Sequence, residues 1–112
     1  MVQYAAHLDL TFGALADATR RGVLERLGRG TASITELAAA FDMTLTGMQK
    51  HVRVLEDAGL VATEKVGRVR TCQLGPNRLD AETQWIAQYQ TQLEARYDQL
   101  GAFLRRTPGD PP

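Results

Sequence analysis

The chain has 112 residues, enough for one domain of ordinary size and too few for a second domain with its own core. Hydrophobic residues make up 44% and charged residues 23% of the sequence, which argues against general disorder and against a fibrous repeat. The 13 lysines and arginines balance the 13 aspartates and glutamates, so the chain is not uniformly basic. We expect a single domain over residues 1–106 and a disordered tail, rich in Pro and Gly, over residues 107–112.

Further function classes are excluded by what the sequence lacks. No apolar run approaches the roughly 20 residues needed to cross a bilayer, and the first ten residues have neither a basic start nor an apolar signal core. Cys72 is the only cysteine, so neither an internal disulfide nor a cysteine-rich metal cluster can form within one chain. We expect a cytoplasmic protein with no membrane partner, no cofactor and no metal site.

The first half of the sequence predicts three helices. Apolar residues at helical spacing, beginning with Leu8 and Phe12, indicate the first. Asp17 stands at the N-cap position of a second helix, which ends at Gly28 to Gly30. The run Ser33 to Glu36 is a capping box, in which the serine and glutamate side chains each bond a free backbone amide. It predicts a third helix of barely two turns.

A fourth helix follows after a break at Asp42. Thr44 is a plausible N-cap, and Met48, Val52 and Leu55 fall at i, i+4 and i+7. Gly59 ends the segment. Two short helices separated by about three or four residues, the second with a polar and basic outer face, are typical of a helix-turn-helix. We call this second helix the recognition helix.

The β-rich runs Leu60–Val66 and Val69–Leu74, joined at Gly67 and Arg68, predict a hairpin with a basic tip. A hairpin directly after a recognition helix is a wing. The predicted fold class is therefore mainly α with a small β-hairpin wing, a winged helix-turn-helix.

From Leu79 onward, apolar residues recur every three or four positions and predict one long helix. About 25 residues give a helix of about 37 Å, long beside the radius of gyration of about 13 Å expected for a 100-residue domain. We expect a second copy of the chain to cover its apolar stripe, together with the first helix. The predicted dimer interface comprises Leu8, Phe12, Trp85, Ile86, Tyr89, Leu93, Tyr97, Leu100 and Leu104.

Charge is unevenly distributed along the chain. Residues 43–78 carry six basic and three acidic side chains, whereas residues 79–104 carry four acidic and one basic. An anionic partner would meet the first of these segments. Gln49 can bond adenine, and Arg53 can bond guanine or a phosphate. The predicted DNA-binding residues are Thr44, Leu45, Thr46, Gln49, Lys50 and Arg53 on the recognition helix, with Lys65, Arg68 and Arg70 on the wing. The alternative is an ordinary solvated surface.

Four stretches occur in a specific order: Phe12–Arg20, Glu36–Ala38, His51–Val61 and Gly67–Arg70. Together they resemble the ArsR family of bacterial winged-helix repressors, over about Leu8 to Leu104. The resemblance implies a homodimer built from the first and last helices, with two recognition helices in successive major grooves of an imperfect inverted repeat. The aromatic last helix is most similar to that of the family's non-metal branch.

The sequence departs from the metal-sensing branches of the family. Some metal sensors of the family place paired cysteines at the start of the third helix, where this chain has Glu36 to Ala39. Other members bind zinc between their last helices through histidines and carboxylates, but the last helix of this chain contains no histidine. Gly47 lies inside the recognition helix at a cost of about 1 kcal/mol relative to alanine, and would permit close approach of the backbone to DNA. DNA binding is expected to need no metal.

Two further side chains, His51 and Cys72, have two interpretations each. His51 lies on the inward side of the recognition helix, where a hydrogen-bonded structural histidine is favoured over a metal ligand or pH switch. His7 is close to the N-terminus. Cys72 is favoured as a small, partly buried apolar residue over a sensing thiol.

The favoured function is that of a dimeric, sequence-specific DNA-binding repressor. The sequence pairs no nucleophile with a base and has no Gly-rich phosphate loop after a strand, so we expect no enzyme. One alternative is a sensor whose DNA affinity is switched by a small apolar effector at the aromatic interface or by oxidation of Cys72. Another is a winged-helix module that binds proteins instead of DNA.

Overall fold

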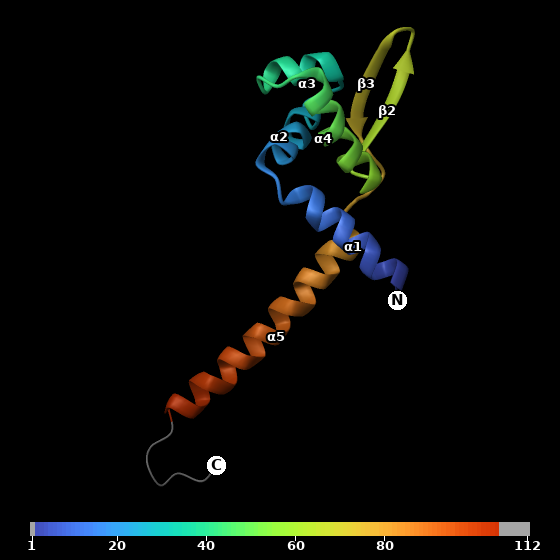
Figure 1. The fold of residues 1–112 in the computed structure, drawn as a ribbon. Helices are drawn as coiled ribbons and strands as arrows, with labels where there is room; N and C mark the ends of the chain where they lie inside the picture. Colours follow the sequence, from blue (N-terminus) through green and yellow to red (C-terminus); the bar gives the residue numbers. More distant parts are fainter. Residues whose placement is uncertain (1, 106–112) are drawn as a thin grey trace. The chain divides into compact units, whose positions relative to one another are not determined.

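The chain's structure, a computed structural model, describes residues 2–105, with side chains from residue 6 onward. Packing divides the chain into two compact units, Met1–Leu79 and Asp80–Pro112. Within the described part of the first unit are helices α1 to α4 and strands β1 to β3, and helix α5 belongs to the second (Figure 1). A single domain over residues 1–106 stays a prediction, and the tail expected over residues 107–112 lies outside the described residues.

Helices α1 (Val2–Leu15) and α2 (Ala18–Leu27) are joined through the predicted cap. The Asp17 carboxylate accepts a 3.0 Å hydrogen bond from the backbone amide of Arg20. The Arg20 guanidinium donates to the carbonyl oxygens of Ala14, at 2.9 Å, and Gly13, at 3.1 Å. Both carbonyls belong to the last turn of α1, where α-helical partners run out, and Gly13 also accepts from the Ala16 amide at 3.2 Å, so Arg20 helps to fix the turn between the two helices.

The predicted helix-turn-helix is confirmed. Helix α3 (Ile34–Ala40) begins with the capping box: Ser33 Oγ accepts from the Glu36 amide at 3.0 Å, and Glu36 Oε1 accepts from the Ser33 amide at 3.2 Å. Asp42 has a φ of 53° in the turn, a left-handed conformation that Asp tolerates better than most residues. Helix α4 (Leu45–Asp57) then starts at the N-cap Thr44.

The core of the first unit lies where α2, α3 and α4 meet the base of the sheet. The predicted stripe of α4, Met48, Val52 and Leu55, is fully buried, together with Val23 of α2 and Leu37 of α3. Burial of each such side chain stabilises the fold by roughly 1.5–3 kcal/mol. The apolar stripe therefore holds α4 firmly enough to present its other face.

The hairpin of β2 (Val61–Val66) and β3 (Val69–Leu74) confirms the predicted wing, which projects from the helices in Figure 1. Val66 pairs with Val69 across a two-residue connection, and Gly67 has the positive φ of 63° that a type II′ turn needs at its first position. A third strand was not predicted: β1 (Ala32–Ser33) pairs antiparallel with β3, giving the order β1-β3-β2. Two residues are too few to show the alternation of a strand.

The chain leaves the sheet through a tight crossing. The Gly75 amide donates to the Leu60 carbonyl at 2.9 Å, and a Cβ at position 75 would collide with the carbonyl oxygen of Gly59. Asn77 follows, with its backbone amide bonded to the same Gly59 oxygen at 2.9 Å. Only glycine at position 75 allows the two segments to approach so closely.

Helix α5 (Asp80–Arg105) confirms the predicted long helix. Its 26 residues extend about 39 Å at 1.5 Å per residue. It leaves a row of large apolar side chains exposed, namely Trp85, Ile86, Tyr89, Tyr97, Leu100, Phe103 and Leu104. Among the helices that the structure describes, none is long and apolar enough to cross a membrane.

Candidate nucleic-acid interface

Helix α4 has a buried face and an exposed face, as its sequence predicts. The six side chains of the recognition helix and its N-cap that are expected to meet DNA are all exposed: Thr44, Leu45, Thr46, Gln49, Lys50 and Arg53. Even the apolar Leu45 is 47% exposed, near the N-terminus of the helix, which is the end that enters the major groove in helix-turn-helix proteins. The packing thus leaves free the face that the pattern assigned to DNA.

Thr44 and Gly47 form the start of this helix. The Thr44 hydroxyl accepts a 3.1 Å hydrogen bond from the Gly47 amide. A Cβ on Gly47 would lie 3.1 Å from that hydroxyl oxygen and 3.2 Å from Cε of Met43, both tighter than an ordinary van der Waals contact. The glycine therefore relieves crowding around the cap, a local role that sequence reasoning missed. Close approach of Gly47 to DNA stays a prediction.

The three basic residues of the wing lie at two positions along the hairpin, one at the tip and two in a cross-strand pair below it. Arg68 is the second residue of the turn at the tip, and it is exposed. Lys65 and Arg70 are direct cross-strand partners, so their side chains lie on one face of the sheet, the face that also carries Cys72. Arg70 is therefore placed below the tip, on the side of the hairpin that holds the core.

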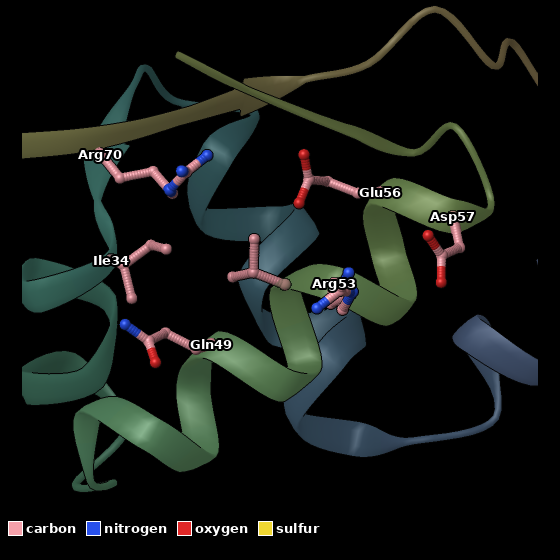
Figure 2. A pocket seen from close by; sticks show the side chains of 7 residues that line it. Ile34, Gln49, Arg53, Glu56, Asp57 and Arg70 are labelled. Carbon is pink, nitrogen blue, oxygen red and sulfur yellow. The ribbon is translucent and has the colours of Figure 1, made fainter. Parts of the chain in front are cut away.

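An open groove of about 610 Å³ runs between α4 and the sheet (Figure 2). It brings together three of the predicted residues, Gln49, Arg53 and Arg70. Its walls carry two basic and two acidic side chains, and its full lining is Ile34, Gln49, Val52, Arg53, Glu56, Asp57 and Arg70. The structure thus joins Arg70 to the recognition helix, and Lys65 and Arg68 are not part of this lining.

Sequence reasoning missed Glu56 and Thr63. The Thr63 hydroxyl donates to the Glu56 carboxylate at 2.8 Å and accepts from Nη1 of Arg70 at 3.0 Å. These three residues come from α4, β2 and β3, so they lie in three different elements and no periodicity within one helix or strand relates them. Only the register of the hairpin brings them together. Thr63 pairs with Cys72 and Arg70 pairs with Lys65, so Thr63 and Arg70 are diagonal neighbours on the same face.

His51 has the structural role favoured by the sequence. It is half-buried, and Nη1 of Arg20 lies 3.1 Å from its Nδ1. Because a guanidinium can only donate, Nδ1 is the acceptor and the ring proton is assigned to Nε2. The Asp17 carboxylate lies 4.0 Å from the same Nδ1, and the hydrogen bond from the Arg20 amide lowers the pKa of Asp17. This cluster ties the N-terminus of α2 to the middle of α4.

Cys72 is fully buried, more so than the partial burial expected. Burial raises the pKa of its thiol to about 11, with the nearby negative charge of Glu56 acting in the same direction. A thiol with this pKa is protonated at neutral pH and is a poor nucleophile. In the described part of the chain, no group of three or more His, Cys, Asp or Glu side chains is placed to hold a metal ion.

A helix-turn-helix followed by a hairpin wing, with an exposed polar and basic helix face beside that wing, defines the winged helix-turn-helix class of DNA-binding domains. Residues 15–64 match the family model described as a helix-turn-helix domain. The HTH-type transcriptional regulator Rv2034 of Mycobacterium tuberculosis is 35% identical over 92 residues, which are 82% of this chain and 86% of that protein.

Solved structures agree with this class. An ArsR family transcriptional regulator is 48% identical, with a TM-score of 0.75, over 84% of this chain and 97% of its own. A homodimeric winged helix-turn-helix DNA-binding domain from Mycobacterium bovis shares the fold at 21% identity, with a TM-score of 0.60, over 86% of this chain and 85% of its own. The chain belongs to the ArsR family of winged helix-turn-helix proteins, and it is a DNA-binding transcriptional regulator, not an enzyme.

Proposed function

We propose that the chain acts as a homodimeric repressor that occupies an inverted-repeat operator through α4 and the wing. The observation that carries this proposal is the exposed face of α4, which lies beside a groove shared with the wing residue Arg70. A protein that covers promoter DNA in this way needs no catalytic group to block transcription.

The proposed contacts fall into two kinds. Gln49 and Arg53, which line the protein groove between α4 and the sheet, contact base edges in the major groove of DNA. Lys50 and Thr46 on α4, with Lys65 and Arg68 on the wing, contact phosphates and fix the register of the protein on the duplex. The full proposed set is Thr44, Leu45, Thr46, Gln49, Lys50, Arg53, Lys65, Arg68 and Arg70.

The dimer is proposed from the exposed stripe of α5. Trp85 and Tyr97 are 47% and 66% exposed, and the stripe continues through Leu100 and Leu104. A row of this length on one face is unusual on a monomer and is covered when two copies pair. Leu93 and Phe12 are half-buried and Leu8 is already buried in the protomer, so α5 supplies most of the proposed interface. The homodimeric Mycobacterium bovis domain has the same fold.

A small apolar effector is a second candidate feature of this regulator. The rings of Trp85 and Tyr89 stack in parallel, with centroids 5.6 Å apart and planes 5° apart, while both side chains remain half exposed. A flat aromatic pair of this kind can accept a planar apolar molecule. Quenching of Trp85 fluorescence by such a molecule, together with release of DNA, supports an effector; unchanged DNA affinity argues against one.

Selection of bound DNA from a random pool tests the main proposal. The parent chain should enrich an inverted repeat, and light scattering should show a dimer both free and on DNA. Recovery of a single half-site bound by a monomer would contradict the dimeric mode, and recovery of no motif would contradict sequence-specific binding. Metal is expected to play no part, so dialysis against a chelator should leave the affinity unchanged.

A further inference from the structure

The hydrogen bonds around Thr63 run in a fixed direction. A threonine hydroxyl has one proton, and here that proton is donated to Oε2 of Glu56 at 2.8 Å. The oxygen's lone pairs are then left to accept from Nη1 of Arg70 at 3.0 Å. Because an ionised acceptor strengthens and orients the first bond, the hydroxyl is a well-aligned acceptor for the second.

Without this arrangement Arg70 would have little to define its position. It is exposed, and its direct cross-strand partner is Lys65, a like charge that disfavours close approach. An exposed arginine also gains up to about 2 kcal/mol of rotamer entropy when free. The bond to Thr63 instead holds the guanidinium on the groove side of the hairpin.

The groove is also where the recognition helix presents its own polar side chains. Figure 2 shows Arg70 and Glu56 pointing toward one another across the groove, with Arg53 and Gln49 further along α4, the helix that carries Glu56. On the proposed DNA-binding surface, a guanidinium held there contacts DNA beside Gln49, whereas Arg68 contacts DNA from the hairpin tip. The two wing arginines are thus placed for different tasks.

We propose that Thr63 is a positioning residue for DNA recognition: anchored by Glu56, it aims Arg70 into the groove between α4 and the wing, so that Arg70 acts together with the recognition helix. This inference rests on the proposed DNA-binding surface and deepens it. Thr63 itself touches no DNA and acts only through Arg70.

Two substitutions of Thr63 separate positioning from packing. Thr63→Val keeps the shape and strand preference but removes the hydroxyl, and Thr63→Ser restores it. On the DNA that the parent selects, measured by fluorescence anisotropy, Thr63→Val should weaken binding by about threefold to tenfold, as expected for the loss of one hydrogen bond of ordinary strength at an exposed site. Thr63→Ser should bind within about twofold of the parent, which a purely structural effect on the strand would not produce.

A double-mutant cycle then identifies the residue through which Thr63 acts. In an Arg70→Ala background, Thr63→Val should cost nothing more, because the side chain that it positions is gone. In an Arg68→Ala background it should retain its full effect. Glu56→Gln, on the exposed side of α4, provides an independent route: because loss of its negative charge favours DNA binding in either background, the weakened anchor should show as a less favourable effect in the parent than in Arg70→Ala, with thermal unfolding confirming that each variant is folded.

Three results would overturn this inference. Parent-like binding by Thr63→Val means that the hydroxyl does not matter, and a loss that adds to that of Arg70→Ala means that it acts elsewhere. Tighter binding by Thr63→Val means that the bond withholds Arg70 from DNA. Failure of the parent chain itself to bind any selected DNA contradicts the proposed function, and this is distinguishable because it precedes every variant.

Discussion

The side-chain oxygen of Asn77 accepts a 2.8 Å hydrogen bond from the amide of Leu79, whose φ is 64°. A left-handed conformation costs a residue such as leucine roughly 1–2 kcal/mol, so it persists only when its surroundings enforce it. The side-chain nitrogen Nδ2 of Asn77 in turn donates to the Ala58 carbonyl at 2.8 Å and to the Thr11 hydroxyl at 3.3 Å. One side chain therefore joins α1, the end of α4 and the residue before α5.

Loss of this side chain should destabilise the first unit. Asn77→Ala removes the partners of Leu79, Ala58 and Thr11 at once, and Thr11 is fully buried. We expect the free energy of unfolding, measured by urea titration, to fall by about 2–3 kcal/mol. Asn77→Asp is the matched control, because it keeps an acceptor for Leu79 but loses the donor. Its free energy of unfolding should fall by a similar amount if the bond to Ala58 dominates. A parent-like midpoint for Asn77→Ala would show that Leu79 holds its conformation unaided.

Two glycines in helices should respond oppositely to alanine. A Cβ on Gly22 would lie 2.7 Å from the Phe41 ring, whereas a Cβ on Gly13 would meet nothing within 4 Å. Alanine gains about 1 kcal/mol of helix propensity at either site, but overpacking costs about 1–3 kcal/mol at the first. Thermal unfolding should show Gly13→Ala stabilised and Gly22→Ala destabilised, with Phe41→Leu partly rescuing the latter. Equal effects at both positions would contradict this packing of Phe41.

The lowered pKa of Asp17 predicts the sign of a pH effect. A carboxyl whose folded pKa lies below its ordinary value of 3.8 stabilises the fold above that pH, and the contribution is lost as pH falls through the folded pKa. Asp17→Asn keeps a capping acceptor but cannot titrate. The stability of the parent should therefore fall more steeply with acid than that of Asp17→Asn. Parallel stability curves from pH about 6 to about 2 would contradict this assignment.

Cys72 should be chemically silent in the folded protein. Its full burial and a pKa raised to about 11 leave almost no thiolate at neutral pH. A disulfide reagent should label it only when the chain unfolds, and Cys72→Ala should bind the selected DNA within about threefold of the parent, with no peroxide response in either. Peroxide-induced release of DNA by the parent, absent in Cys72→Ala, would favour the redox-sensing alternative.

The features predictable from the sequence are those encoded by neighbouring residues. The caps at Asp17, Ser33 and Thr44 each depend on a side chain and an amide three residues apart, and all three form. The apolar stripes and the hairpin likewise follow from local periodicity. These local signals were sufficient for the order of helices and for the exposed face of α4.

The contacts that sequence reasoning missed depend on how distant segments meet. Strand β1 exists only because β3 is present to pair with it, and Gly75 is required only because Gly59 lies against it. Thr63 joins Glu56 to Arg70 through hairpin register, so its role appears only in three dimensions. The sequence therefore predicted the surface that is proposed to bind DNA, but not the residues that hold that surface in place.

In the proposed complex, α4 distinguishes bases while the wing tip contacts phosphates. The most direct test is titration of the selected operator and its single-base variants with the parent, Gln49→Ala and Arg68→Ala at several salt concentrations. Gln49→Ala should lose about 1–3 kcal/mol and relax discrimination at one base position, with the salt slope unchanged. Arg68→Ala should bind all sequences more weakly and lower the slope by about one per lost phosphate contact. Parent-like affinity, specificity and salt dependence in both variants would contradict the account.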